Sequence, residues 1–302
     1  METLSSNTLF HFTGNASYLV SILQEGFKPR YCLENFSMFE FILGTENTEL
    51  AVPMVCFCDI PLSKVKDHVV KYGSFGIGMT KDWGIREKVS PLMYVNEKSA
   101  TTLGLSNTIS HLYTQQEVLR AFGAQLVGSE LFYKFSESDT EEESLDLTTL
   151  TNEQLEQHAK FLKIRAIGDS LGEAYSSQLR VIRFTKPYYA EKWRKWNNVR
   201  FYDEREWRFV PDIQRQKDGL LPWINKERYD DEIGRELFNY RLGQQFPLRF
   251  KPEDIKYIIV EKESQVPAII RQIDNSDKYN REAIKAMLKS KILTKQQIFD
   301  DF

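Results

Sequence analysis

The stretch LFHFTGNASYLVSILQEGFKPR, residues 9–30, decides how the chain begins to fold. Together with Thr8, its first residues form the short apolar run TLFHFT, which predicts a β-strand. A helix is expected to follow, because Asn15 is a favourable N-cap and Gly26 a favourable C-terminal stop. The apolar residues between these caps recur at helical spacing and form one face: Tyr18, Leu19, Ile22 and Leu23. The stretch therefore predicts a strand that passes directly into an amphipathic helix.

Strand and helix signals continue to alternate as far as residue 98. The runs PMVCFCDI, SFGIGMT and SPLMYVN predict strands. Between the first two, PLSKVKDHVVKYG predicts a helix that begins at Pro61 and ends at Gly73. The next segment changes to helical periodicity and contains the acidic stretch SESDTEEESLD, which is typical of a solvated linker or helix end. Strand signals return in LRVIRFT, EWRFVPDI and IKYIIVE, and the last forty residues predict two short helices.

This order of elements predicts an α+β fold that a helical insertion divides. We expect four parts along the chain: the N-terminal half of the main domain at 1–98, the insertion at 99–165, the C-terminal half at 166–262, and terminal helices at 263–302. The late strands would then lie beside the early ones in a split sheet.

The composition bounds the function. With 302 residues, of which 41% are hydrophobic, the chain can bury a sizeable core, and a net charge of -3 gives no global field that would hold DNA or a membrane. No apolar run reaches the roughly 18 residues of a membrane span, and the first ten residues do not resemble a signal peptide. Three unevenly spaced cysteines predict no disulfide framework. We therefore expect a cytoplasmic protein without membrane contact.

His11 is the first candidate functional residue. A histidine between Phe10 and Phe12 is by itself more typical of a core residue that bonds to the backbone. However, LFHFT followed by a helix with SIL and then EGF resembles the opening of the ADP-ribosyltransferase fold of the poly(ADP-ribose) polymerase type. That resemblance implies that His11 binds a ribose hydroxyl of NAD, that Phe12 and Thr13 line the nicotinamide site, and that NAD is a substrate. Phe12 stands where that family has glycine.

A second block, VCFCDIPLSKVKDHVVKYGSFGIGM, resembles the same family's strand, helix and glycine-rich strand. Cys56 stands where the family has a tyrosine, so Tyr72 or Phe75 would have to supply the wall for the nicotinamide ring. Cys56, Cys58 and His68 also suggest zinc, but the cysteines are spaced more closely than in structural zinc sites and no second pair exists. We therefore interpret the thiols as buried apolar groups and expect no metal.

The third block, FYDEREWRFVPDI, places acidic residues before an apolar strand, where they commonly form its solvated entry. REWRFV resembles the family's last catalytic strand, with Glu206 in the position of the catalytic glutamate. The resemblance implies that this carboxylate stabilises the oxocarbenium-like transition state as the bond to nicotinamide breaks. Glu204 is expected on the same face of a continuing strand, where it would recruit the acceptor. Arg30 would reach a pyrophosphate oxygen.

Just upstream, KPYYAEKWRKWNNVRFYDEREWR mixes basic and aromatic residues. This pattern suits a stacked base beside a phosphate, in NAD or in a nucleic acid. The alternative is an aromatic-rich helix that packs on the sheet, with Trp193 and Trp196 on one buried face.

Four segments also resemble a narrower group, the AbiGi-type abortive-infection proteins of bacteria: YCLE, PMVCFCDIPLS, YGSFGIGM and FYDEREWRFVP. That resemblance covers most of residues 8–260 and implies one partner, the antitoxin, of a two-gene antiviral defence system. Two functions follow. The first is an NAD-consuming ADP-ribosyltransferase or NAD glycohydrolase whose acceptor is a protein, a nucleic acid or water. The second is a non-catalytic module that controls a partner toxin through protein or nucleic-acid contact. His11, Glu204 and Glu206 favour the first; the departures at Phe12 and Cys56 favour the second.

Overall fold

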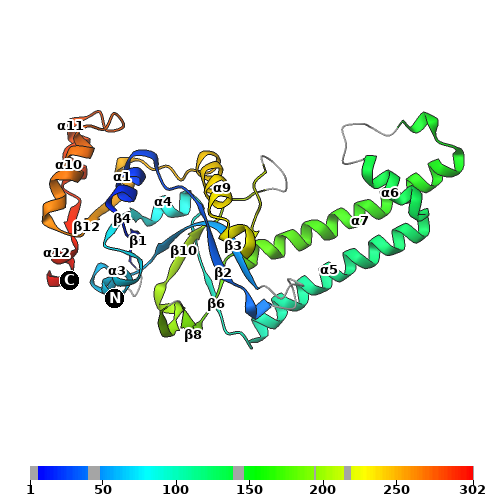
Figure 1. The fold of residues 1–302 in the computed structure, drawn as a ribbon, viewed down its shortest axis with the longest axis horizontal. Helices are drawn as coiled ribbons and strands as arrows, with labels where there is room; N and C mark the ends of the chain where they lie inside the picture. Colours follow the sequence, from blue (N-terminus) through cyan, green and yellow to red (C-terminus); the bar gives the residue numbers. More distant parts are fainter. Residues whose placement is uncertain (1–5, 40–47, 139–145, 194, 214–218, 302) are drawn as a thin grey trace. The chain divides into compact units, whose positions relative to one another are not determined.

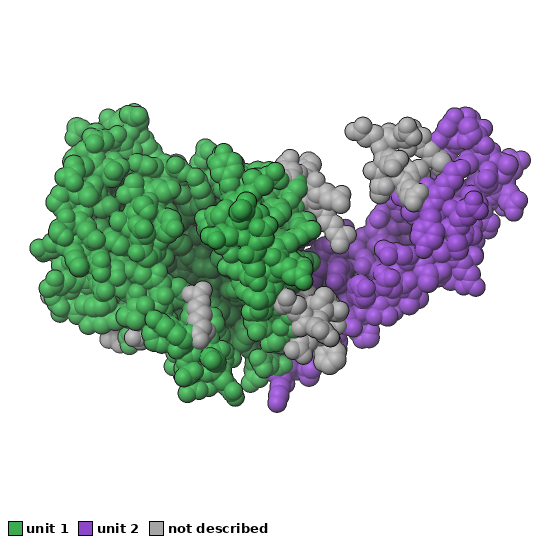
Figure 2. Space-filling model, in the orientation of Figure 1, with its two compact units in different colours: residues 1–38, 45–97, 184–302 green, residues 39–44, 98–183 purple. Residues whose placement is uncertain are grey.

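The computed structural model describes residues 6–39, 48–138, 146–193, 195–213 and 219–301. The chain divides into two compact units. Unit 1 comprises residues 1–38, 45–97 and 184–302, and unit 2 comprises residues 39–44 and 98–183 (Figure 2). The predicted insertion at 99–165 falls within unit 2, but unit 2 extends to residue 183 because one long helix continues that far.

Unit 1 is built on a nine-stranded mixed sheet, which confirms the α+β prediction (Figure 1). Seven strands follow one path in the order β13-β12-β4-β1-β3-β10-β5, and β2 and β11 also pair with β3. The strands are β1 Thr8–Thr13, β2 Arg30–Asn35, β3 Glu49–Cys58, β4 Phe75–Thr80, β5 Ser90–Pro91, β10 Glu206–Phe209, β11 Ile224–Asn225, β12 Ile255–Val260 and β13 Ile292–Thr294. Two small sheets accompany them, β6 Met93–Val95 with β7 Thr185–Pro187, and β8 Tyr189–Trp193 with β9 Trp196–Arg200.

The helices of unit 1 cover both faces of the main sheet. They are α1 Ala16–Glu25, α3 Lys66–Tyr72, α4 Lys81–Arg86, α8 Lys226–Asp230, α9 Glu232–Gln245, α10 Val266–Asp274, α11 Glu282–Lys289 and α12 Lys295–Asp301. The caps of α1 are those that the sequence predicts: the Asn15 side chain accepts from the Ser17 amide, and Gly26 ends the helix with φ of 90°. The predicted helix after Pro61 forms as the 3-10 helix η2, Leu62–Lys64, followed by α3.

The register of the sheet assigns every central residue to a face. Phe10 lies opposite Cys58, and Glu206 also lies opposite Cys58. Because opposed residues share a face, Phe10, Cys58 and Glu206 lie on one side, called here the second face. The first face carries His11, which lies opposite Ile77, and Trp207, which lies opposite Phe57.

Unit 2 is built on two long helices, α5 Ala100–Val127 and α7 Asn152–Ile182, and a shorter one, α6 Ser129–Ser138. Phe132, Phe135, Phe161 and Ile164 form its buried cluster together with Val127. Gly123 lies in this cluster, where an added Cβ would be 2.6 Å from Phe132. The long acidic stretch predicted between the helices falls partly on 139–145, outside the described residues.

Three predictions of secondary structure are wrong. LRVIRFT is not one strand, because α7 continues to Ile182 and β7 begins only at Thr185. The basic aromatic stretch is not a helix but the hairpin β8–β9, in which Trp193 lies opposite Trp196. The last forty residues hold a strand, β13, besides three helices. In each case pairing or packing with a distant segment outweighs the local pattern.

Among the described residues, no helix is both long enough and apolar enough to cross a membrane.

Candidate functional site

The candidate site is a network of buried charges on the second face of the sheet, in unit 1. Glu206 and Arg208 are two residues apart in β10, so both side chains project to this face. β7 contributes Lys186, β2 contributes Glu34, and the 3-10 helix η4, Phe201–Glu204, contributes Glu204. Burial of so many charges is costly unless every charge is paired, so the pairing decides what the network can do.

Both oxygens of the Glu206 carboxylate are engaged. Oε2 accepts a hydrogen bond from Lys186 Nζ at 2.8 Å, and Oε1 accepts one from Arg208 Nε at 2.5 Å. Burial acts to raise the pKa of Glu206, but the charges of Arg208 and Lys186 outweigh it and hold the pKa well below its usual range. Glu206 is therefore an ionised carboxylate clamped between two cations.

Glu204 reaches the same lysine from a different element. Its Oε2 accepts from Lys186 Nζ at 3.1 Å, and its Oε1 accepts from the Tyr72 hydroxyl at 2.9 Å. The prediction that Glu204 continues the strand of Glu206 is wrong: Glu204 is the last residue of η4, and the left-handed φ of 44° at Arg205 interrupts the extended backbone before Glu206. The two carboxylates converge on one cation of β7, because both accept a hydrogen bond from Lys186 Nζ.

Lys186 and Arg208 are the buried cations of the network, and Lys71 Nζ lies 3.8 Å from Glu204 Oε1. Burial opposes the charge of each buried cation, but the surrounding glutamates raise the pKa of both well above the usual values. Arg208 is completely buried and also donates through Nη2 to Glu34 Oε2 at 3.0 Å. The Lys186 ammonium lies 4.5 Å from the centre of the Phe201 ring.

Four members of this network were not among the predicted site residues: Glu34, Tyr94, Lys186 and Arg208. Tyr94 accepts a hydrogen bond from the Glu206 amide through its hydroxyl, at 2.8 Å. Arg208 had a signal, since a residue two positions after Glu206 in a strand shares its face. The others come from strands whose neighbours are set only by the tertiary fold.

His11 does not join Glu206. It lies on the first face, where its ring contacts Phe27 and Phe57 at centroid distances of 5.4 and 5.7 Å, and its Nδ1 donates to the Cys56 carbonyl at 2.8 Å. Burial lowers the pKa of His11, so the neutral ring is favoured. An ADP-ribosyltransferase site would require His11 close to Glu206, but β1 and β10 hold the two side chains on opposite faces of one sheet.

The predicted NAD-contacting residues are also dispersed. Tyr72 is in the network, where its ring lies 6.1 Å from Trp193. Phe12 packs on the second face near His68, whereas Thr13 and Phe75 lie opposite each other on the first face, where Phe75 is buried in the core. Arg30 pairs with Glu236 of α9 at 2.6 Å. The structure thus brings together Tyr72, Glu204 and Glu206 only.

The cysteines line the same face as the network. Cys58 packs against Phe10 and Phe12, and Cys56 lies opposite Arg208 of β10. Burial raises the pKa of both thiols, and nearby carboxylates raise it further. Within the described residues, no group of three or more His, Cys, Asp or Glu side chains is placed to hold a metal ion.

We expect the contribution of Glu206 to stability to be lost in acid. The unfolded carboxyl titrates near its ordinary value of 4.5, whereas the folded carboxyl stays ionised to lower pH. The contribution is therefore complete above about pH 5.5 and falls as the pH drops below 4.5, by up to about 1.4 kcal/mol per pH unit. Urea unfolding of the wild type and Glu206→Gln from about pH 3 to 6 measures it. The difference between the two free energies of unfolding should become smaller as the pH is lowered. A difference that does not change with pH would contradict the pairing of Glu206 with Arg208 and Lys186.

Comparisons with known proteins agree on one family. A family profile described as "Putative abortive phage resistance protein AbiGi, antitoxin" matches residues 25–261. The "Abortive phage resistance protein AbiGi" of Lactococcus lactis subsp. cremoris is 27% identical over 293 residues, which cover 91% of this chain and 99% of that protein. No solved structure matches the chain.

Proposed function

Because the chain belongs to the AbiGi family of abortive phage resistance proteins, we propose that it acts as an antitoxin that restrains a partner toxin by direct contact. The family description supplies the class of partner. The charge network also agrees with a binding function. Arg208 of the same strand holds one oxygen of Glu206 and Lys186 of β7 holds the other, so the carboxylate stabilises β10 against β7.

The observation that carries the proposal is an exposed apolar stripe on α5. Val118, Phe122 and Leu126 follow one another at intervals of four residues, so they lie along one side of the helix. Their exposed fractions are 56%, 54% and 43%. The core of unit 2 is formed by other residues of the same helix, such as Ile109, Gly123 and Val127. Contiguous exposed apolar side chains on a helix are typical of protein interaction sites.

The test uses the product of the neighbouring gene as the toxin. Val118→Ser combined with Phe122→Ser is expected to abolish copurification with the toxin and to reduce growth rescue at least tenfold, because the anchors of the interface are lost. Ile233→Ser, which alters an exposed apolar residue of α9 in unit 1, is the matched control and should bind normally. Thermal unfolding of each variant establishes that the fold is retained. Normal toxin binding by a folded double variant would show that the stripe is not the toxin-binding surface.

A second candidate is the NAD-consuming ADP-ribosyltransferase, with the fold of that class. It is favoured by the convergence of Glu204, Glu206 and Tyr72 around Lys186. The same purified protein, incubated with NAD alone and with extract of phage-infected cells, distinguishes the two. Nicotinamide release by the wild type that is absent in Glu206→Gln would replace the antitoxin proposal with the enzyme.

A further inference from the structure

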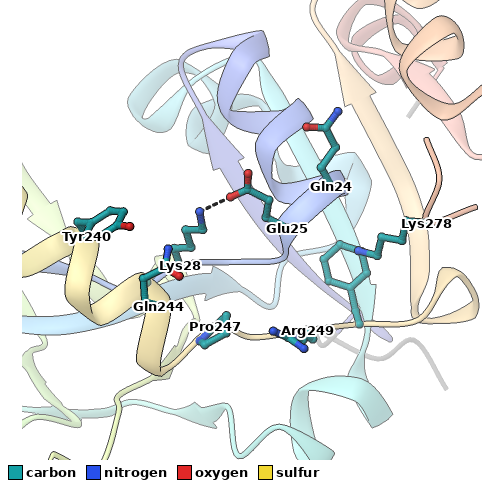
Figure 3. A pocket seen from close by; sticks show the side chains of 10 residues that line it. Gln24, Glu25, Lys28, Tyr240, Gln244, Pro247, Arg249 and Lys278 are labelled. Carbon is teal, nitrogen blue, oxygen red and sulfur yellow. Dashed lines mark hydrogen bonds and ion pairs between the residues drawn. The ribbon is translucent and has the colours of Figure 1, made fainter. Parts of the chain in front are cut away.

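A pocket of about 670 Å³ lies in unit 1, where the end of α1 meets the end of α9 (Figure 3). Gln24, Glu25 and Lys28 border it on one side, and Tyr240 and Gln244 on another. The two borders are fixed to each other by paired backbone hydrogen bonds between Phe27 and Leu248, at 3.0 and 2.8 Å. Gly26 permits this close approach, since a Cβ there would lie 2.4 Å from the Leu248 carbonyl oxygen. The pocket is thus a built feature of the fold.

Three cations line the pocket, and one carboxylate opposes them. Lys28 forms an ion pair with that carboxylate, Glu25. Within the part of the chain that the structure describes, Arg249 and Lys278 form no ion pair with any carboxylate. Burial lowers the pKa of Lys278, and the charge of Arg249 lowers it further. The pocket therefore has an excess of positive charge that a bound anion would neutralise.

The positions of two of these cations are set by packing. Lys278 lies over the Phe250 ring at 4.3 Å from its centre and donates to the Leu23 carbonyl at 3.1 Å, which leaves two of its three N–H donors for a ligand. The stem of Lys28 runs over Gly243 of α9, where an added Cβ would lie 3.0 Å from Lys28 Cδ. The glycine provides the room for this lysine.

An aromatic residue stands at the border of the same pocket. The Tyr240 side chain is 66% exposed, and Figure 3 shows it on α9 on the opposite side of the pocket from Lys278. Exposed aromatic rings beside cations are the groups with which proteins stack bases next to phosphates.

From this arrangement we propose that the pocket binds a nucleoside polyphosphate, with its phosphates at Arg249 and Lys278 and its base against Tyr240. Guanidinium and ammonium groups are the usual partners of phosphate oxygens. The pocket borders the first face of the sheet, because Phe250 contacts Phe27, which packs against His11. The ligand site is thus separate from the charge network and from the stripe on α5, and its test is independent of the antitoxin proposal.

Isothermal titration calorimetry of the full chain with ATP tests the proposal, with sodium tripolyphosphate as a second ligand. Arg249→Gln combined with Lys278→Gln should weaken ATP binding at least tenfold, and Tyr240→Ala should weaken ATP but not tripolyphosphate. Arg228→Gln, which removes an exposed cation of α8 that does not line the pocket, is the control and should bind ATP as the wild type does. ATP binding should also weaken as salt is raised.

Two outcomes would overturn the proposal: no ATP binding by the wild type at millimolar concentration, or equal ATP binding by the folded double variant. Equal affinity for ATP and tripolyphosphate would show that the base makes no stabilising contact with Tyr240. Thermal unfolding without ligand identifies a variant that fails to fold. In that case Arg249→Gln alone decides the result, because the Arg249 side chain is exposed at the pocket.

Discussion

Arg208→Met is expected to lower the free energy of unfolding by about 3–5 kcal/mol, the usual cost of removing one partner from a buried charge pair. Arg208 is completely buried, and its guanidinium bonds to Glu206 and Glu34 at once. Methionine fills a similar volume but leaves two carboxylates facing each other without their shared cation.

The matched control is Arg30→Met. Arg30 also pairs with a glutamate, Glu236, but both side chains are about half exposed. Exposed pairs contribute roughly 0–1 kcal/mol, so this variant should unfold nearly as the wild type does. Urea unfolding followed by circular dichroism measures both variants. Equal effects of the two substitutions would show that burial does not set the strength of the network.

Gly73→Ala is the second variant for which we expect a large loss, of about 3 kcal/mol. Gly73 ends α3 with φ of 124°, a backbone conformation that residues with a side chain rarely adopt. A Cβ there would lie 2.3 Å from the carbonyl carbon and oxygen of Thr13. Because the overlap is with backbone, β1 and α3 would have to move apart. Tyr72, the residue just before Gly73, would lose its hydrogen bond to Glu204.

Gly14→Ala is the control for that experiment. Gly14 adjoins the same turn, but a Cβ there would meet nothing within 4 Å. Its free energy of unfolding should change by no more than about 0.5 kcal/mol. Thermal unfolding of the two variants compares the same chemical change at neighbouring sites. A similar melting temperature for both would contradict the crowding at Gly73.

The sequence by itself determined the local elements and the family. The spacing of apolar residues and the caps at Asn15 and Gly26 depend only on neighbours in the chain, so α1, β3, β4 and β12 form where those patterns predict them. The blocks YCLE and FYDEREWRFVP identified AbiGi in the same way, because a family motif is read residue by residue.

Only the tertiary structure decided which of these residues meet. The register of β1 and β10 against β3 places both Phe10 and Glu206 opposite Cys58, so His11, the neighbour of Phe10, lies on the other face of the sheet. A shift of one position in a strand changes the face of every side chain, and no local pattern records that register. Lys186 likewise reaches Glu204 and Glu206 across 18 and 20 positions of the chain, which include the paired strands β8 and β9 and the 3-10 helix η4. Because strand pairing is set by long-range packing, the site is a network of paired charges around Glu206 and does not include His11.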